Sequence, residues 1–292
     1  MATGPGGRSG TGAHAGSAAT GRLVESERAA LPRVVGRPHA LVRSLLAQPY
    51  TGIAPETARH RLLLSATARV SLVVKIDDSP YRPPGFVQGT HDRYALVDGE
   101  CARSYVEVGM APLGAYRLLG RPIDELGETV VDLQDVFGTS GQRLVEAIRD
   151  ESTWRGRFAV LDRFLLNAAE RGPEPSAEVA WAWRRIVDSE GTTAIGHVAK
   201  EVGWSHKRLI TRFARQVGLT PKKAARLVRF EHLLAHVTTD RTTPWPVAAA
   251  EAGYADQAHM IRDFRAFTGV TPTEYLARRG GKFVQDPGAA RS

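Results

Sequence analysis

The chain has 292 residues, about the length of two average domains, and its 42% hydrophobic and 24% charged residues are typical of a globular protein. No apolar run approaches the roughly 20 residues that a membrane helix needs, and the N-terminus lacks the apolar core of a secretory signal. The single cysteine, Cys101, excludes an intramolecular disulfide and a cysteine-based zinc or iron–sulfur site. We therefore expect a cytoplasmic protein without a membrane segment.

The net charge of +8 lies entirely in the last third of the chain. Residues 184–292 carry 18 Lys or Arg and 10 Asp or Glu, whereas residues 1–183 carry 21 of each sign. A basic part joined to a neutral part is typical of a chain that binds a polyanion through one module. A solvated basic surface gives the same charge, so composition alone does not decide between the two.

Residues 1–22 are mostly Gly, Ala, Ser and Thr, which predicts a disordered tail. Residues 37–138 follow as a β-rich region, because short runs with many β-branched residues are punctuated by Pro and Gly. The expected strands are 62–64, 70–76, 94–97 and 105–108. Short helices are expected at 114–119 and 123–126, with a final strand or turn at 130–137.

Residues 139–188 are predicted to form a helical connector. Between residues 140 and 170 the apolar residues recur at spacings of three and four, the pattern of an amphipathic helix. A breaker at 172–176 ends that stretch, and Ser176 can cap a helix over 177–188.

Residues 192–280 read as a string of helices, with Gly or Thr-Pro at the boundaries. The expected helices are 194–202, 205–217, 221–237, 244–253, 256–268 and 272–276.

This basic part contains a degenerate repeat at an offset of 50 to 51 residues. Each unit consists of a helix, a Gly-aromatic turn, a second helix, a Gly and a Thr-Pro pair. The matched pairs are Ala199/Ala249, Glu201/Glu251, Gly203/Gly253, Trp204/Tyr254, Leu209/Met260, Phe213/Phe264, Gly218/Gly269, Thr220/Thr271 and Pro221/Pro272. This order is the signature of a helix-turn-helix, and two copies in the basic third favour DNA binding.

Residues 195–279, about 85 of the 292, resemble the tandem helix-turn-helix domain of AraC/XylS-type transcriptional regulators. The most specific stretch is Gly253–Pro272, and the first unit, Ile195–Pro221, fits less closely. A softer resemblance covers Val106–Leu133, which is similar to the N-terminal domain of one subset of these regulators. The resemblance implies a sequence-specific activator or repressor that binds double-stranded DNA at the nucleoid.

A recognition helix buries one face and presents the other to the major groove. In helix 205–217 the family's base-reading positions fall on Lys207, Ile210 and Thr211. Lys207 suits guanine and Ile210 suits a thymine methyl. Thr211 departs from the Arg that many members carry, so we expect less specificity from this unit.

In helix 256–268 we expect Gln257, His259 and Arg262 to face outward, and these three are the candidates for reading bases. Gln257 suits adenine and Arg262 suits guanine, each through two hydrogen bonds. A phosphate contact, or an ion pair with Asp256 or Asp263, is the alternative for Arg262.

The other basic side chains are candidates for phosphate contacts, which give affinity and register without sequence information. They are His206, Arg208, Arg212, Arg215, Lys222, Lys223 and Arg265. Each is equally well explained as a solvated surface charge.

Helix 221–237 should separate the two units by about 25 Å, at 1.5 Å per residue. Two recognition helices held in this way can enter successive major grooves, about 34 Å apart along the DNA. Because the two helices differ in sequence, a single chain should prefer an asymmetric site.

The resemblance implies that residues 37–138 form a cupin-like barrel that binds a small effector or mediates dimerisation. It also implies RNA polymerase as a further partner. No His-x-His pair is present, so we expect no metal and no cofactor. Tyr81, Phe86, Tyr94 and Tyr105 either line a pocket or form ordinary core, and Cys101 is either a sensor or an inert thiol. The helices of 141–168 either dimerise the protein or pack on their own β-rich region.

The main alternative is a cupin-like enzyme or repair protein fused to a DNA-targeting domain. It needs a metal cluster or a reactive cysteine, and a lone Cys101 cannot build a four-cysteine zinc site. The sequence also lacks a Gly-rich phosphate loop and a nucleophile elbow. A third reading is a protein-interaction factor that no longer binds DNA, which the charge asymmetry and the intact second motif disfavour. We therefore expect no enzyme and no catalytic residue.

Overall fold

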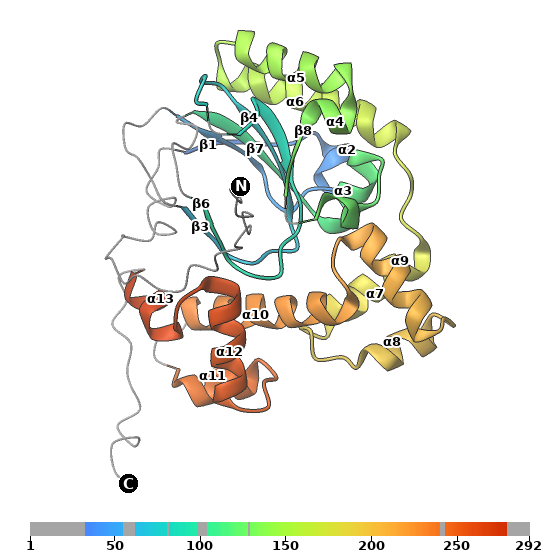
Figure 1. Cartoon of the computed structure of the whole chain (residues 1–292), viewed down its shortest axis with the longest axis vertical. Helices are drawn as coiled ribbons and strands as arrows, with labels where there is room; N and C mark the ends of the chain where they lie inside the picture. Colours follow the sequence, from blue (N-terminus) through green and yellow to red (C-terminus); the bar gives the residue numbers. More distant parts are fainter. Residues whose placement is uncertain are drawn as a thin grey trace, which may run out of the picture.

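The computed structural model describes residues 33–54, 62–80, 82–97, 104–127, 129–239 and 243–278. Figure 1 shows strands and helices of the N-terminal half next to a group of helices from the C-terminal part. The tail expected at 1–22 lies outside the described residues, as do Tyr81 and Cys101. Within the described part, no helix is both long and apolar enough to span a bilayer.

Six of the described strands form one antiparallel sheet in the order β1-β2-β7-β4-β5-β8. They are β1 (Arg33–Gly36), β2 (Tyr50–Ile53), β4 (Val70–Lys75), β5 (Gly85–Gln88), β7 (Tyr105–Met110) and β8 (Val130–Asp132). A separate antiparallel pair joins β3 (Leu62–Leu64) to β6 (Ala95–Val97). The expected α+β class is confirmed, but the sheet is open, with β1 and β8 at its edges, where the resemblance implied a closed barrel.

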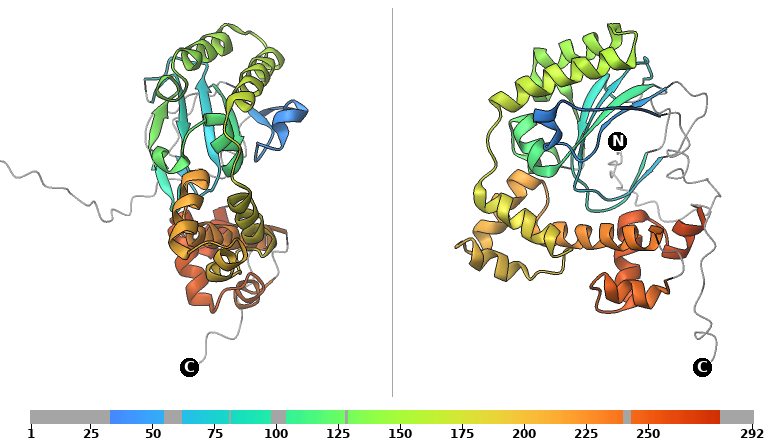
Figure 2. Two further views of the ribbon diagram at one scale, coloured as in Figure 1. Left: turned by 90° about the vertical axis from the view of Figure 1, so that its right-hand side faces the viewer. Right: turned by 180° about the vertical axis from the view of Figure 1, so that it is seen from behind.

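One face of this sheet forms a hydrophobic core with helices. Alternate residues of a strand point to the same face, and Val70, Leu72 and Val74 of β4 are completely buried on that side. The helices that complete this core are α3 (Pro112–Leu119), α5 (Thr139–Asp150) and α6 (Trp154–Arg171). Figure 2 shows these helices along one side of the sheet.

Short helices complete the β-rich region, which we define as residues 33–138. They are α2 (Ala40–Arg43), the 3-10 helix η1 (Ile123–Leu126) and α4 (Leu133–Phe137). The segment 130–137, expected as one strand or turn, divides into β8 and α4. The reason is a helix cap, because the Asp132 carboxylate accepts a hydrogen bond from the backbone N–H of Gln134 at 2.7 Å.

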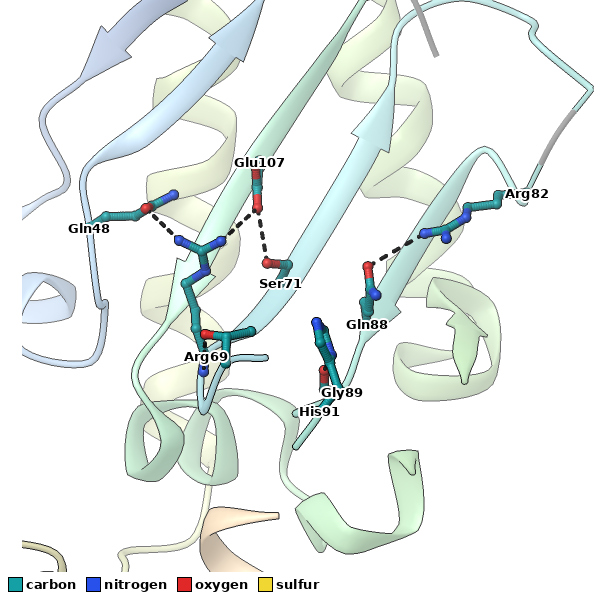
Figure 3. Close-up of polar contacts among 9 residues, drawn as sticks. Gln48, Arg69, Ser71, Arg82, Gln88, Gly89, His91 and Glu107 are labelled. Carbon is teal, nitrogen blue, oxygen red and sulfur yellow. Dashed lines mark hydrogen bonds and ion pairs between the residues drawn. The ribbon is translucent and has the colours of Figure 1, made fainter. Parts of the chain in front are cut away.

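The opposite face of the sheet carries a small apolar cluster and a buried carboxylate. Phe86 and Tyr105 pack there with Ile53 and Val73, so these two pocket candidates belong to a core cluster. The buried Glu107 accepts a hydrogen bond from the Ser71 hydroxyl at 2.9 Å and faces the Arg69 guanidinium at 3.7 Å (Figure 3). Tyr94 lies apart from them and is 41% exposed.

A second core is formed almost entirely by helices. It includes α7 (Ala177–Asp188), whose Val179, Ala182 and Ile186 are completely buried against the C-terminal helices. Ser176 caps α7 as expected, accepting a hydrogen bond from the backbone N–H of Val179 at 3.4 Å. The segment expected as one connector is therefore split between two cores, with α5 and α6 on the sheet and α7 on the C-terminal helices.

The C-terminal helices follow the predicted order closely. They are α8 (Ile195–Glu201), α9 (His206–Val217), α10 (Pro221–Thr239), α11 (Trp245–Glu251), α12 (Gln257–Thr268) and α13 (Pro272–Arg278). Figure 1 shows α10 as a long helix with α8 and α9 near one end and α11, α12 and α13 near the other. The first element of each repeat unit thus packs beside its own second element, at opposite ends of one helix.

Candidate nucleic-acid interface

The two repeat units have the same turn between their helices. Gly203 and Gly253 adopt φ angles of 68° and 73°, which glycine reaches without a steric penalty. The backbone N–H groups of Trp204 and Tyr254 donate to the carbonyls of Ala199 and Ala249, both at 2.9 Å. The two alanines are buried, which lets the paired helices approach closely. Each repeat unit is therefore a helix-turn-helix.

The second helix of each unit is capped at both ends. Ser205 accepts a hydrogen bond from the backbone N–H of Arg208 at 3.2 Å, and Asp256 accepts one from His259 at 2.6 Å. Gly218 and Gly269 end the two helices in the left-handed conformation, with φ angles of 87° and 74°. These caps fix where each recognition helix begins and ends.

The predicted inward stripe is buried in both recognition helices. Leu209 and Phe213 of α9 are completely buried, and so are Met260 and Phe264 of α12. Phe230 of α10 packs edge-on against Phe264, with ring centroids 5.2 Å apart. Burial of these apolar side chains orients the polar face of each helix outward.

The outward face of α9 carries all five of the basic side chains predicted for it. His206, Lys207, Arg208, Arg212 and Arg215 are exposed. Arg208 also stacks over the Trp204 ring, with 4.7 Å between its guanidinium carbon and the ring centroid, which holds it near the turn.

The two uncharged base-reading candidates of α9 have less reach. The Thr211 hydroxyl donates back to the carbonyl of Lys207 at 3.1 Å, so its proton is used within the helix. Ile210 is half-buried. Of the three base-reading candidates on this helix, Lys207 therefore has the longest free reach.

On α12, Gln257, Arg262 and Arg265 are exposed. The ion pairs considered as an alternative for Arg262 do not form, because both carboxylates have other partners. Asp256 caps the helix, and Asp263 binds Arg226 of α10 through Nη2 at 2.6 Å. Arg262 therefore projects from the helix with no competing carboxylate among the two that the sequence offers.

His259 is placed differently from the expectation that it faces outward. Its ring is half-buried and packs edge-on against Tyr254, with centroids 5.3 Å apart. Its Nε2 lies 3.9 Å from a carboxylate oxygen of Asp263. The side chain therefore turns toward its own turn and helix.

Two interactions at this surface were not predicted. The Arg226–Asp263 ion pair joins α10 to α12, and its hydrogen bond holds the pKa of Arg226 above the usual value. Lys223, expected as a phosphate contact, binds the Asp92 carboxylate of the β-rich region at 2.7 Å. Lys222 beside it remains exposed. Both interactions join residues far apart in sequence, so no local sequence pattern predicts them.

Within the described residues, no group of three or more His, Cys, Asp or Glu side chains is arranged to hold a metal ion. His91 is buried, and its Nδ1 lies 3.0 Å from the carbonyl of Gly89.

These features define a tandem helix-turn-helix unit with a basic outer face, which is the architecture of a DNA-binding domain. Residues 198–278 match the family described as helix-turn-helix domain. The predicted resemblance to AraC-type regulators is confirmed for this part of the chain, which is a DNA-binding, transcription-regulating domain.

Two bacterial proteins are among the solved structures that the chain matches. The C-terminal domain of AraT, a response regulator from Geobacillus stearothermophilus, is 20% identical, with 41% of this chain and 97% of that one covered and a TM-score of 0.33. ToxT from Vibrio cholerae is 10% identical, with 80% of this chain and 98% of that one covered and a TM-score of 0.44. ToxT with a bound unsaturated fatty acid is 12% identical over 81% and 96%, with a TM-score of 0.41. No curated protein matches the chain.

Proposed function

We propose that the protein is a sequence-specific transcription regulator that reads two successive major grooves with α9 and α12. The observation that carries this proposal is the repetition of one unit. Both recognition helices have the same turn and caps, bury the same stripe, and expose polar and basic residues on the other side.

The base-reading set is centred on Arg262, Gln257 and Lys207. Arg262 suits O6 and N7 of guanine, and Gln257 suits N6 and N7 of adenine. Lys207 donates to guanine from α9. Ile210 and Thr211 make at most short-range contacts, and we leave His259 out because its ring packs on Tyr254.

The phosphate-contacting set is His206, Arg208, Arg212, Arg215, Lys222 and Arg265, all exposed on the two recognition helices or at the start of α10. Lys223 joins this set only if it leaves Asp92. Such cations supply affinity that falls with salt.

The length of α10 suits this mode of binding. Its 19 residues span about 28 Å at 1.5 Å per residue, which approaches the roughly 34 Å between successive major grooves. We expect the recognised site to be asymmetric, because α9 and α12 present different side chains.

We further propose that residues 37–138 modulate this binding, through a small effector or through pairing of two copies, with residues 139–188 as connector and 192–280 as the DNA-binding domain. The buried Glu107 and its Arg69 neighbour are charged groups that a polar effector can engage. We place the protein in the cytoplasm at the nucleoid, with RNA polymerase as a partner, and assign it no catalytic step.

The test is selection from a pool of random 40-base-pair duplexes by the purified full-length protein. The proposal predicts enrichment of two different short motifs on one face of the duplex, about one helical turn apart. An Arg262→Ala variant selected in parallel should lose preference at one base pair of one motif. Recovery of a pool no different from the input would refute the proposed function.

A further inference from the structure

One segment of the β-rich region touches both helix-turn-helix units. Thr90–Tyr94, which we call the bridging strip, connects β5 to β6. At its first residue, Thr90 lies against Gly218, the C-cap of α9. A Cβ atom on Gly218 would be 2.6 Å from the Thr90 hydroxyl oxygen and 2.7 Å from a methyl of Ile123. This end of the strip is thus in close contact with the first unit.

The other end of the strip holds the second unit at the equivalent place. The Tyr94 ring covers Gly269, the C-cap of α12, where an added Cβ would be 2.9 Å from Cδ2. The backbone N–H of Tyr94 donates to the carbonyl of Ala266 at 3.1 Å, and that of Ala66 donates to Phe267 at 2.9 Å. The last carbonyls of α12 are therefore bonded to the β-rich region.

Between these two ends, the Asp92 carboxylate binds Lys223 at the beginning of α10, at 2.7 Å. The Asp92 side chain is 11% exposed and that of Lys223 is 49% exposed, so the pair is shielded from water on the Asp92 side only. The strip thus contacts α9, α10 and α12, which are the three helices that define how the two reading surfaces are oriented.

The strip is itself fixed to the sheet. His91 and Thr67 exchange backbone hydrogen bonds at 3.1 and 2.8 Å, and the His91 ring lies 3.0 Å from the Gly89 carbonyl (Figure 3). Gly89 directly follows β5, so only this one residue separates the strip from the end of that strand.

The position of these contacts shows whether the strip supports the recognition helices or covers their DNA-reading ends. Base contacts come mainly from the N-terminal part of a recognition helix. The strip touches Gly218 and Gly269 at the C-terminal ends, and Lys207 and Gln257 near the N-terminal ends remain exposed. The strip therefore leaves the N-terminal ends of both recognition helices uncovered.

We propose that the bridging strip holds the two recognition helices in one relative orientation and thereby sets the separation of the two DNA motifs that the protein accepts. The inference rests on the proposed function for its DNA part. Besides the strip, the units are joined by α10, by the Ala66–Phe267 hydrogen bond and by the packing of α3 and η1 on α9, and a long helix such as α10 bends gently. A bend of a few degrees over about 28 Å moves the far unit by about 2 Å, enough to admit motifs at neighbouring separations.

The first experiment needs no DNA. Spin labels are placed on full-length protein at Lys200→Cys and Ala250→Cys, exposed and equivalent positions of the two units, in a Cys101→Ser background. We expect one narrow distance distribution, which widens or shifts when Asp92→Ala and Tyr94→Ala are combined. Arg93→Ala is the matched control, because it removes only a long 3.9 Å contact to Asp92 from a side chain that is 70% exposed, and it keeps the Lys223 pair and the Tyr94 contacts. An unchanged distribution in the double variant would overturn the proposal.

The second experiment repeats the selection from random duplexes. The parent and Arg93→Ala should enrich the two motifs at one separation, and the double variant should enrich the same motifs at several. Retention of the single separation would overturn the inference and leave the proposed function standing. Failure of the parent to enrich any motif would refute the proposed function. The spin-label distances would still test whether the strip holds the two units in one orientation. Tyr94→Ala alone, which removes the exposed ring that covers Gly269, serves as a second variant if the double variant unfolds.

Discussion

Arg226 on α10 and Asp263 on α12 form an ion pair through Nη2 and Oδ1 at 2.6 Å, with a second contact from Nε at 3.4 Å. The Asp263 side chain is 4% exposed and that of Arg226 is 38% exposed. The pair is thus buried on one side only. It ties the second recognition helix to α10 and, by engaging Asp263, leaves Arg262 without that partner.

The unequal exposure of the two partners predicts unequal costs of removing them. Arg226→Met leaves a buried carboxylate without its cation and should lower the free energy of unfolding by about 3 kcal/mol. Asp263→Asn leaves an arginine that reaches water, so we expect a loss of only about 1 kcal/mol. Denaturant unfolding of the two variants measures the difference. Equal losses of unfolding free energy in the two variants would show that burial of the unpaired Asp263 carboxylate does not destabilise the protein.

Arg262→Ala should weaken binding to the enriched duplex by about 1–3 kcal/mol, or roughly five- to 150-fold. Arg265→Ala, an exposed arginine one turn along the same helix, is the matched control. As a phosphate contact it should weaken binding to enriched and scrambled duplexes alike. Fluorescence anisotropy on both duplexes separates the two roles. Equal losses for Arg262→Ala on both duplexes would demote it to a phosphate contact.

Salt dependence tests the phosphate-contacting set. Arg212→Ala on α9 should lower the slope of log affinity against log salt by about one unit, because one fewer counterion is released. Arg163→Ala, an exposed arginine on α6, should leave the slope unchanged. The measurement is anisotropy on scrambled duplex between about 50 and 200 mM salt. A changed slope for Arg163→Ala alone would place the DNA on the other side of the molecule.

Two glycines of the first unit should respond oppositely to alanine. Gly203 has a φ of 68° and no neighbour for a Cβ within 4 Å, so Gly203→Ala introduces backbone strain alone and should cost about 1 kcal/mol of stability. Gly196 lies exposed within α8 and is equally open. Gly196→Ala should therefore stabilise the protein by about 0.5–1 kcal/mol. Thermal unfolding checks both signs, and a stabilising Gly203→Ala would contradict the turn geometry.

The helices of the C-terminal part could be predicted because their boundaries are local. Gly203, Gly218, Gly253 and Gly269 need positive φ angles, and the sequence marks each one by its position in the repeat. The strands were predicted less completely, since β1, β2 and β5 are four residues long and β5 lies between Pro and Gly residues. Short strands depend on their neighbours in the sheet for stability, so their own residues carry little signal.

The interactions that orient the reading surface could not be predicted. Arg226 and Asp263 are 37 residues apart, and Asp92 and Lys223 belong to different regions of the chain. Whether such side chains meet depends on how helices and loops pack, and the hydrophobic periodicity of the sequence does not predict that packing. His259 shows the same limit, because helical spacing placed it on the outer face but could not predict the edge-on contact of its half-buried ring with Tyr254.

The most direct test of the central claim is the affinity of the full-length protein for an enriched duplex against a scrambled duplex of equal composition, both titrated with salt. The account predicts binding to the enriched duplex at least about a thousandfold tighter at physiological salt, with a steep salt dependence on both. Equal affinity for the two duplexes would contradict sequence-specific reading by α9 and α12.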